Sequence, residues 1–497
     1  MLYTSTRDTS LRVEASEAIA KGISDEGGLF VPCEIPEISI KELEDMIPLS
    51  YIERAKRILS LYLTDFTPEE IDYCVQGAYR EGKFRSEKVA PLVTLDDNTE
   101  ILELFKGPTC AFKDMALQLL PYLLTTSARK AAPDKEIVIL VATSGDTGKA
   151  ALEGFKDVPG TRILVFYPEK GVSPVQKLQM ITQEGDNVGV CAINGNFDDA
   201  QSGVKRIFTD RKVSEKLAEA GLMFSSANSI NWGRLVPQVV YYCSAYCDMM
   251  EKGKVKPGEP MNVVVPTGNF GNILAAYYAK RMGVPIKRLV CASNANNVLT
   301  DFLRTGTYDR NRDFYTTTSP SMDILISSNL ERLLFHMSDE NDSLIRTWMY
   351  ELAETGRYKV SEEVFEKISD IFSAGCADDR ETGATIKETY EKYGYLADTH
   401  TSVAIAVYRD YVKATGDKTP TVIASTASPY KFSKSVLEGL TGETPDMEEV
   451  DMSAVLEEKT GTRIPAPLSG LKDKKIRFAG VSEFSDMEKQ VYKMLGL

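Results

Sequence analysis

The sequence predicts an α/β fold in which helices cover a parallel sheet. Continuous apolar runs of strand length recur along the chain, as at 137–142, and such runs are typical of strands buried on both faces. Segments with helical periodicity separate these runs. Parallel strands need long crossover connections, so strands that alternate with helices favour a parallel sheet.

The composition is that of a soluble globular protein, with 43% hydrophobic and 26% charged residues. A chain of 497 residues can bury a sizeable core and suggests two or three domains. The net charge of −14 argues against broad binding of nucleic acid or of anionic membranes. It is compatible with a local basic pocket for a small phosphate.

The chain carries few residues that bind metals or form disulfide frameworks. Its eight cysteines include no CxxC pair, and His336 and His400 are the two histidines of the sequence. We therefore expect no metal site, and a reducing, cytoplasmic location. The first residues contain no long apolar run and no run could span a bilayer, so we expect neither a secretory signal nor a membrane span.

Residues 1–95 combine helical patterns over 40–63 and 68–82 with a turn and short strand at 27–32. We find no catalytic constellation there and expect a packing domain.

Lys113 lies between a strand and a helix. Residues 101–105 read as a short strand, 106–109 break the pattern, and apolar residues from Met115 onward recur at helical spacing. A lysine at such a turn can project into a cleft. Taken alone, it can equally be a solvated surface charge.

The alternating region extends from residue 136 to about 440. Predicted strands are 137–142, 163–167, 188–193, 261–265, 289–292 and 421–426. Predicted helices are 174–183, 198–211, 233–252, 273–282 and 431–440, and residues 320–394 are largely helical. The tail from residue 452 is charged and gives no clear pattern.

Three polar turns follow strands and precede helices. In 268–272, glycines permit close approach of a ligand and the helix N-terminus offers N–H groups to an anion, so this turn is a candidate phosphate cradle. The turn 144–148 can hold a carboxylate or phosphate, although Ser144 or Asp146 could instead cap the helix. In the turn 225–234, Arg234 can bind an oxyanion through two hydrogen bonds. The alternative is that this segment is an ordinary polar loop with a surface arginine.

Two anion-binding turns and a well-placed lysine together suggest a phosphorylated cofactor beside a Schiff-base lysine. Such a lysine must lose its proton to attack an aldehyde, so it belongs in a pocket.

At these residues the chain resembles the threonine synthase family, pyridoxal-phosphate enzymes of the tryptophan-synthase-β fold, or fold type II. The resemblance runs nearly end to end and is most specific at 103–114 and 319–324 in combination. It implies two open, three-layer α/β domains around a cofactor cleft. The implied divisions are an N-terminal, mostly helical domain (1–95), a large cofactor-binding domain (96–133 and 260–450), a small α/β domain (134–259) and a C-terminal extension (451–497).

The resemblance also assigns roles to individual residues. Lys113 is the catalytic, cofactor-bearing lysine, and Thr426 lies beside the pyridine nitrogen. The cofactor phosphate is expected on Gly268, Asn269, Phe270, Gly271 and Asn272. Substrate is expected to contact Ser144, Asp146, Thr147, Asn228, Ser229, Asn231 and Arg234.

The implied activity is that of a carbon–oxygen lyase acting on phosphates, which converts O-phospho-L-homoserine and water into L-threonine and phosphate by γ-elimination and β-addition. This is the last step of threonine biosynthesis. The expected partner is this small substrate, and the expected state is a monomer or homodimer. Two alternatives stay open: a phospho-lyase on a related phosphorylated amino acid, and a catalytically inactive cofactor-binding module.

Four positions depart from the usual family pattern. Lys106 and Ser428 stand where many relatives have histidine, Thr399 stands where proline is usual, and Tyr430 stands where alanine is usual. These departures bear on substrate contacts and leave Lys113 and the 268–272 loop intact.

Overall fold

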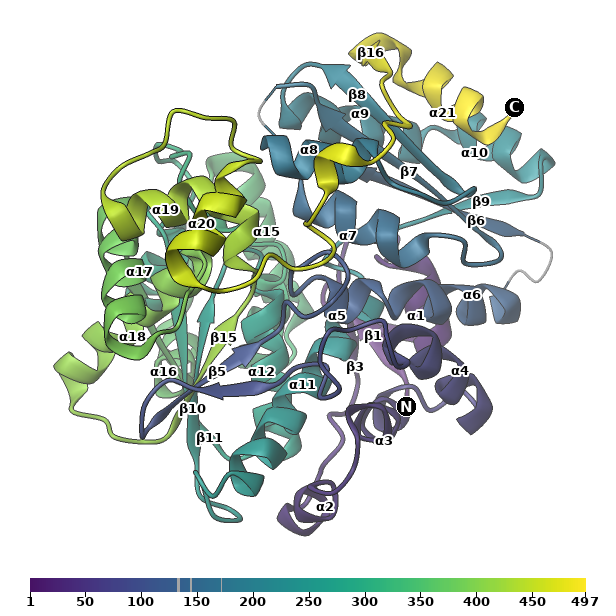
Figure 1. Ribbon diagram of the computed structural model, residues 1–497. Helices are drawn as coiled ribbons and strands as arrows, with labels where there is room; N and C mark the ends of the chain where they lie inside the picture. The colour runs from purple at the N-terminus through teal and green to yellow at the C-terminus, as the bar shows by residue number, and fades with distance from the viewer. Residues whose placement is uncertain (132–134, 144, 171) are drawn as a thin grey trace.

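The computed structural model describes residues 1–131, 135–143, 145–170 and 172–497. Two sheet-containing α/β domains lie beside an N-terminal, mostly helical segment, and the C-terminal segment runs from the larger domain to the smaller one (Figure 1). The predicted α/β fold is confirmed. None of the described helices is both long and apolar enough to cross a membrane.

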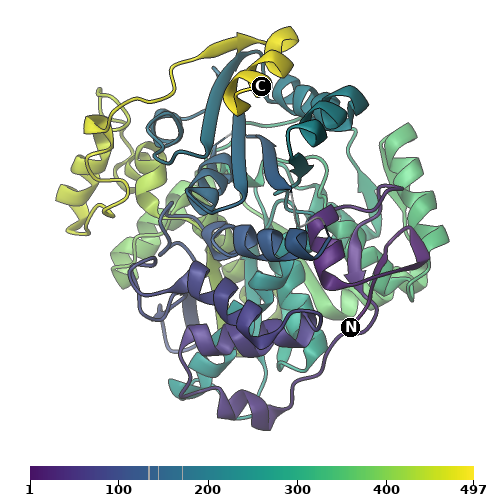
Figure 2. The same cartoon turned by 90° about the vertical axis from the view of Figure 1, so that its right-hand side faces the viewer.

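The N-terminal segment contains a small antiparallel sheet and four helices (Figure 2). Its elements are β1 (Tyr3–Ser5), β2 (Asp8–Val13), α1 (Ala15–Lys21), β3 (Phe30–Pro32), α2 (Ile40–Asp45), α3 (Tyr51–Tyr62) and α4 (Pro68–Tyr79). Each of the helices α2, α3 and α4 starts with a capping box. In each box a Ser or Thr hydroxyl accepts the backbone N–H of a Glu three residues later, and the carboxylate of that Glu accepts the backbone N–H of the Ser or Thr. These local signals explain why α2, α3 and α4 were predictable, whereas α1 has no such cap and was not predicted.

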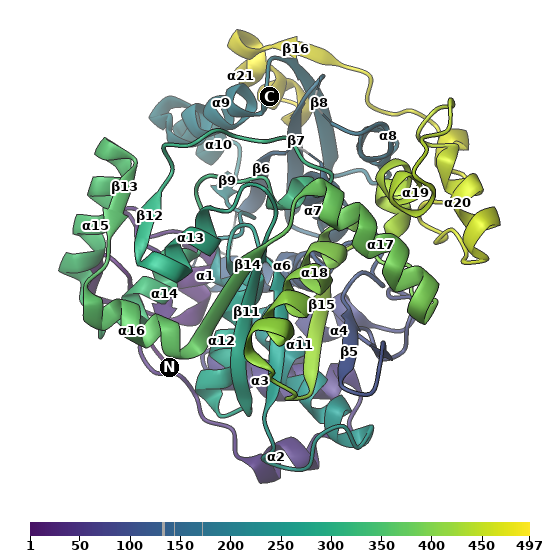
Figure 3. The same ribbon diagram turned by 90° about the vertical axis from the view of Figure 1, so that its left-hand side faces the viewer.

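The large domain is built on a six-stranded sheet of order β14-β11-β10-β15-β5-β4, parallel except at β4 (Figure 3). The strands are β4 (Leu92–Thr94), β5 (Thr99–Glu103), β10 (Met261–Pro266), β11 (Ile286–Ser293), β14 (Phe372–Cys376) and β15 (Thr421–Ser425). Val263 and Val265 pack in one core cluster with α11 (Trp232–Glu251) and α12 (Gly271–Met282). Val264 packs in another cluster with α18 (Thr399–Thr415), so the sheet is the middle of three layers.

Further helices and a two-stranded sheet surround this core. They are α5 (Asp114–Leu117), α6 (Leu120–Ala131), α13 (Val298–Thr305), β12 (Thr307–Asp309), η1 (Pro320–Met322), α14 (Leu330–Met337), α15 (Asp342–Thr355), β13 (Arg357–Lys359), α16 (Glu362–Ile371), α17 (Asp379–Tyr393), η2 (Pro429–Phe432), α19 (Ser433–Thr441), α20 (Met452–Thr460) and η3 (Leu471–Asp473).

The small domain has a parallel five-stranded sheet of order β16-β8-β7-β6-β9. Its elements are β6 (Glu136–Ala142), α7 (Asp146–Phe155), β7 (Thr161–Pro168), α8 (Pro174–Ile181), β8 (Val188–Asn194), α9 (Phe197–Thr209), α10 (Arg211–Glu219), β9 (Leu222–Ser225), β16 (Val481–Glu483), η4 (Phe484–Asp486) and α21 (Met487–Leu495). Ile139 shares a core cluster with α7, whereas Leu140 shares one with α9, α10 and α21. This domain is therefore also three-layered.

Several elements differ from the sequence-based expectation. β14 lies within residues 320–394, which the sequence presents as largely helical. Two helices, α5 and α6, replace one continuous helix after Lys113. The C-terminal tail, which gave no pattern, supplies β16 and α21 to the small domain. β4 pairs with β5 in the large sheet although it precedes residue 95.

Candidate active site

The turn that carries Lys113 is held by the residues on either side of it. The Asp114 carboxylate accepts hydrogen bonds from the Thr109 N–H at 2.8 Å and the Thr109 hydroxyl at 2.7 Å. The Phe112 N–H donates to the carbonyl of Thr426 at 2.8 Å, which joins the turn to the end of β15. Two segments more than 300 residues apart thus place Lys113 directly before α5.

Lys113 is half-buried, and its amine responds to three charged neighbours. Burial lowers the pKa of Lys113 from 10.5 to about 8. The Asp146 carboxylate opposes this shift, while the cations of Lys431 and Arg234 add to it. The amine is therefore far closer to its neutral, nucleophilic form at neutral pH than a solvated lysine would be.

Asp146 and Lys431 form a buried ion pair. The Lys431 Nζ lies 2.5 Å from Asp146 Oδ1 and donates to the Thr109 carbonyl at 3.1 Å. Gln176 donates to the same carboxylate at 2.9 Å. Burial alone would raise the pKa of Asp146, but the ammonium groups of Lys431 and Lys113 and these hydrogen bonds hold it well below its usual range. The carboxylate is therefore ionised.

A residue outside the predicted set caps helix α7. The Thr143 hydroxyl accepts the N–H groups of Gly145 at 3.0 Å and Gly148 at 2.9 Å. Asp146 is thereby left for the ion pair with Lys431, and Thr147 is half-buried in the first turn. Ser144, a predicted substrate contact, lies outside the described residues.

The predicted phosphate loop follows β10 and opens α12. Phe270 adopts a left-handed conformation at φ 63°, and its ring packs 5.8 Å from that of Phe372. A Cβ on Gly268 would lie 2.7 Å from the Ser321 carbonyl oxygen, so glycine is required there. Ser327 donates to the Gly268 carbonyl at 2.7 Å, which fixes the loop from outside.

The segment before α11 divides into a structural residue and residues with spare polar groups. The Asn231 side chain accepts from Gly233 N–H and donates to the carbonyls of Ile19 and Ser226, so its amide is used within the protein. Asn228 is exposed. The Ser229 hydroxyl lies 3.4 Å from that of Ser328, which donates to Asn269 at 3.3 Å. This brings the segment beside the phosphate loop.

Arg234 is 4% exposed and donates from its NH1 atom to the Ala227 carbonyl at 2.6 Å. Its Nε has no hydrogen-bond partner among the described residues. Burial lowers the pKa of Arg234 to about 10, and the guanidinium is still charged at neutral pH. A buried arginine with an unused donor is a ready ligand for an anion.

Together these residues place one carboxylate, Asp146, and two further cations, Lys431 and Arg234, near the Lys113 amine. Such a site favours an anionic ligand that also carries a group able to react with an amine.

Comparison with known proteins identifies the family. The family models described as threonine synthase N terminus, pyridoxal-phosphate dependent enzyme and threonine synthase, C-terminal match residues 2–79, 91–426 and 401–491. A threonine synthase of Eremothecium gossypii is 38% identical over 88% of this chain and 89% of that protein. The chain belongs to the threonine synthase family.

A solved threonine synthase with bound pyridoxal phosphate, from Brucella melitensis, covers 99% of both chains at a TM-score of 0.89 and 37% identity. Threonine synthase-like 1 of Macaca fascicularis is 43% identical over 87% of this chain. The chain spans 59% of the length of that relative.

Pyridoxal phosphate is the cofactor of this threonine synthase family, and the 268–272 loop fits its phosphate. The Asn272 Oδ1 accepts hydrogen bonds from Tyr241 at 2.8 Å and Tyr242 at 2.5 Å. Those bonds orient the amide so that its buried Nδ2 has no partner among the described residues. An unpaired donor beside a helix N-terminus suits a phosphate oxygen.

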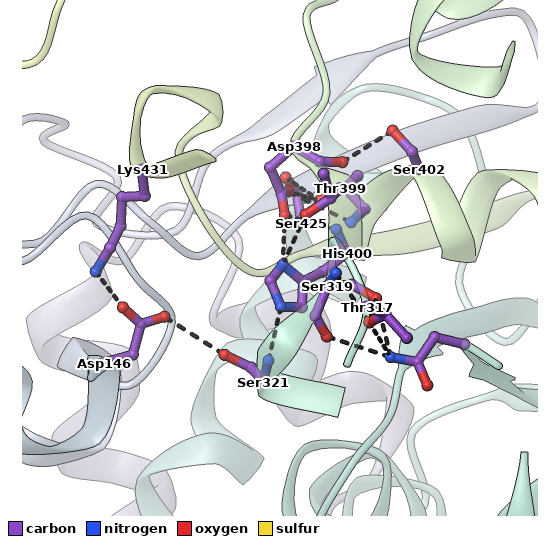
Figure 4. A network of polar contacts seen from close by, with 12 residues as sticks. Asp146, Thr317, Ser319, Ser321, Asp398, Thr399, His400, Ser402, Ser425 and Lys431 are labelled. Carbon is purple, nitrogen blue, oxygen red and sulfur yellow. Dashed lines mark hydrogen bonds and ion pairs between the residues drawn. The ribbon is translucent and has the colours of Figure 1, made fainter. Parts of the chain in front are cut away.

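Sequence reasoning missed part of the polar network around the site. Lys431, Gln176 and Ser321 contact Asp146. His400 joins Ser321 to Asp398, which connects to Ser425 at the end of β15 through Thr401 (Figure 4). Ser321 lies within the 319–324 segment that carries the family resemblance, and Lys431, Gln176 and His400 lie far from the predicted turns. No local pattern indicated that these residues share one polar network. The described residues contain no group of three or more His, Cys, Asp or Glu side chains that could hold a metal ion.

Proposed function

We propose that the protein is a threonine synthase, a carbon–oxygen lyase that converts O-phospho-L-homoserine and water into L-threonine and phosphate. The observation that carries this proposal is the charge arrangement at Lys113. One ionised carboxylate, Asp146, and two cations, Lys431 and Arg234, act on the Lys113 amine, and this excess of positive charge suits a phosphorylated amino acid.

Each residue has a separate task in this reaction. The ε-amine of Lys113 takes and returns protons at the α and β carbons of the substrate. Arg234, with its unused Nε donor, holds the phosphate that leaves from the γ carbon. The cofactor, when bound, supplies the conjugated ring that accepts carbanion charge.

The remaining predicted contacts are part of the same proposal. Asp146 and Thr147 at the start of α7 and Asn228 and Ser229 beside the loop line the substrate side. Thr426 faces the cofactor ring, and its carbonyl bond to the Phe112 N–H keeps that strand end beside Lys113.

We place the reaction in the cytoplasm, with a monomer or homodimer as the active form. All eight cysteines are free thiols, which is typical of a reducing compartment.

The test is to load the purified protein with pyridoxal phosphate, add O-phospho-L-homoserine, and measure free phosphate and threonine together. Equal amounts of the two products support threonine synthase. Absence of both, with cofactor bound, would overturn the proposed substrate and favour a catalytically inactive binding protein.

A second candidate is a phospho-lyase on a related phosphorylated amino acid. It is favoured by the 43% identity to proteins named threonine synthase-like 1. The two candidates share the cofactor site, so the products separate them: the phospho-lyase would release phosphate with a keto acid in place of threonine.

A further inference from the structure

A short turn at Ser319–Asp323 touches both halves of the site. The Ser321 carbonyl lies against Gly268, so closely that a Cβ there would come within 2.7 Å. The Ser321 hydroxyl points to Asp146 Oδ2 at 3.5 Å (Figure 4). Any shift of this turn would therefore disturb the phosphate loop and the carboxylate beside Lys113 together.

His400 holds this turn from the other side. Its Nε2 lies 3.1 Å from the Ser321 backbone N and accepts that N–H. Its Nδ1 lies 3.0 Å from Asp398 Oδ1. Since Nε2 must offer a lone pair to the N–H, the ring proton is on Nδ1 and is donated to Asp398. The ring is 2% exposed and packs 4.9 Å from the ring of Phe432.

The supports of His400 are themselves anchored near the cofactor. Asp398 also accepts the N–H of His400 at 2.9 Å and a hydrogen bond from the hydroxyl of Thr401. The Thr401 hydroxyl lies 2.9 Å from that of Ser425, directly before Thr426. Phe432 directly follows Lys431, the partner of Asp146. The imidazole therefore connects the end of β15, the Asp146–Lys431 pair and the turn over the phosphate loop.

We propose that His400 is a positioning residue whose neutral imidazole, with its proton on Nδ1, holds the Ser321 turn in the geometry that binds cofactor and substrate. A proton added to Nε2 removes the only lone pair offered to the Ser321 N–H, so acid would release the turn. The substrate half of this proposal rests on the proposed function, whereas the cofactor half does not.

Several charged groups lie close to His400. Asp398 is in direct contact with its ring, with Oδ1 3.0 Å from Nδ1. Beyond Ser321 lie Asp146 and Lys431, whose charges balance one another. Asp323, at the end of the turn, accepts hydrogen bonds from Asn294 and Thr317.

The protein offers a matched control because its sequence has two histidines. His336 is buried, its Nε2 lies 2.9 Å from the Tyr278 hydroxyl, and burial lowers its pKa to about 3. It does not change charge in the range where activity is measured. A histidine signal that changes with pH above about pH 5 is therefore not that of His336.

The experiment is histidine-labelled NMR of the holoenzyme, with pyridoxal-phosphate affinity and kcat/KM measured over the same pH range. We expect the Nδ1–H tautomer for His400, and cofactor affinity and kcat/KM that fall on the acid side with the midpoint of its ring signal. An Nε2–H tautomer, or an acid limb with a different midpoint, would overturn the proposal.

Three variants complete the test. His400→Gln places a carbonyl oxygen where Nε2 was, so it should retain most activity and lose the acid limb. His400→Phe should lower kcat/KM by about tenfold to a hundredfold and weaken cofactor binding at all pH values, because it leaves the turn unsupported. His336→Gln should keep the acid limb. A limb that persists in His400→Gln would refute the assignment, and unchanged cofactor affinity in His400→Phe would refute it even if the substrate were another compound.

Discussion

Replacing Lys431 with methionine should make Lys113 a weaker nucleophile. The change removes a cation that acts against protonation of Lys113 and leaves the Asp146 carboxylate without its partner 2.5 Å away. Asp146 is then available to stabilise the Lys113 ammonium, so the pKa of Lys113 rises. Lys431→Arg retains the charge and is the matched control.

The size of the effect follows from the pKa of Lys113. With a pKa of about 8 in place of 10.5, about one amine in ten is neutral at pH 7, against about one in three thousand for a solvated lysine. The site therefore increases the neutral amine about three hundredfold. Each pKa unit regained by Lys431→Met lowers the rate of amine modification at pH 7 about tenfold.

The assay is reductive methylation of the cofactor-free protein as a function of pH, with modification of the Lys113 peptide followed by mass spectrometry. Because only the neutral amine reacts, the rate rises with pH, with a midpoint near pH 8 in the wild type. The midpoint should move to higher pH in Lys431→Met and to lower pH in Asp146→Asn. Circular dichroism of each variant checks folding. A wild-type midpoint near 10.5, or the same midpoint in all the variants, would refute the reasoning.

Four further predictions each concern the replacement of one residue. Lys113→Ala should abolish turnover and the absorbance of lysine-bound cofactor; a variant that retains both would contradict its role. Arg234→Ala should raise KM for the phosphorylated substrate at least about tenfold with little change in cofactor affinity, measured by steady-state kinetics and fluorescence titration, whereas equal loss of both would indicate a structural role. Gly268→Ala should weaken cofactor binding and cost about 1–3 kcal/mol in the free energy of unfolding, because its Cβ would meet the Ser321 carbonyl. Met487→Ala should lower the free energy of unfolding, measured by denaturant titration, by about 2–5 kcal/mol, because Met487 is fully buried against the small sheet. An unchanged unfolding midpoint would contradict that packing.

Local sequence patterns were sufficient to predict many of the strands and helices of the fold. Apolar runs predicted strands such as β6 and β10, because a strand covered on both faces needs apolar residues at successive positions. The helices α3 and α4 directly follow a Ser or Thr that forms hydrogen bonds with a Glu three positions later, so their start signals lie within one turn of chain.

Short edge elements were missed for a physical reason. β16 has three residues, Val481–Glu483, of which Val481 is 48% exposed, so it carries no apolar run. β14 includes Gly375 and Cys376 and follows α16 directly, so the helical pattern before it obscures the strand. Each becomes a strand because an existing sheet edge supplies its hydrogen bonds.

The sequence by itself determined the α/β class, the lysine turn and the glycine loop, since each is specified by residues adjacent in the chain. The tertiary structure decided which charged side chains surround Lys113 and its neighbours. Lys431 reaches Asp146, and His400 reaches Ser321, only because the sheets bring strand ends and turns together from distant parts of the chain. The pKa of Lys113 depends on burial and on the charges of these neighbours, and both are set by the packing of the domains around it.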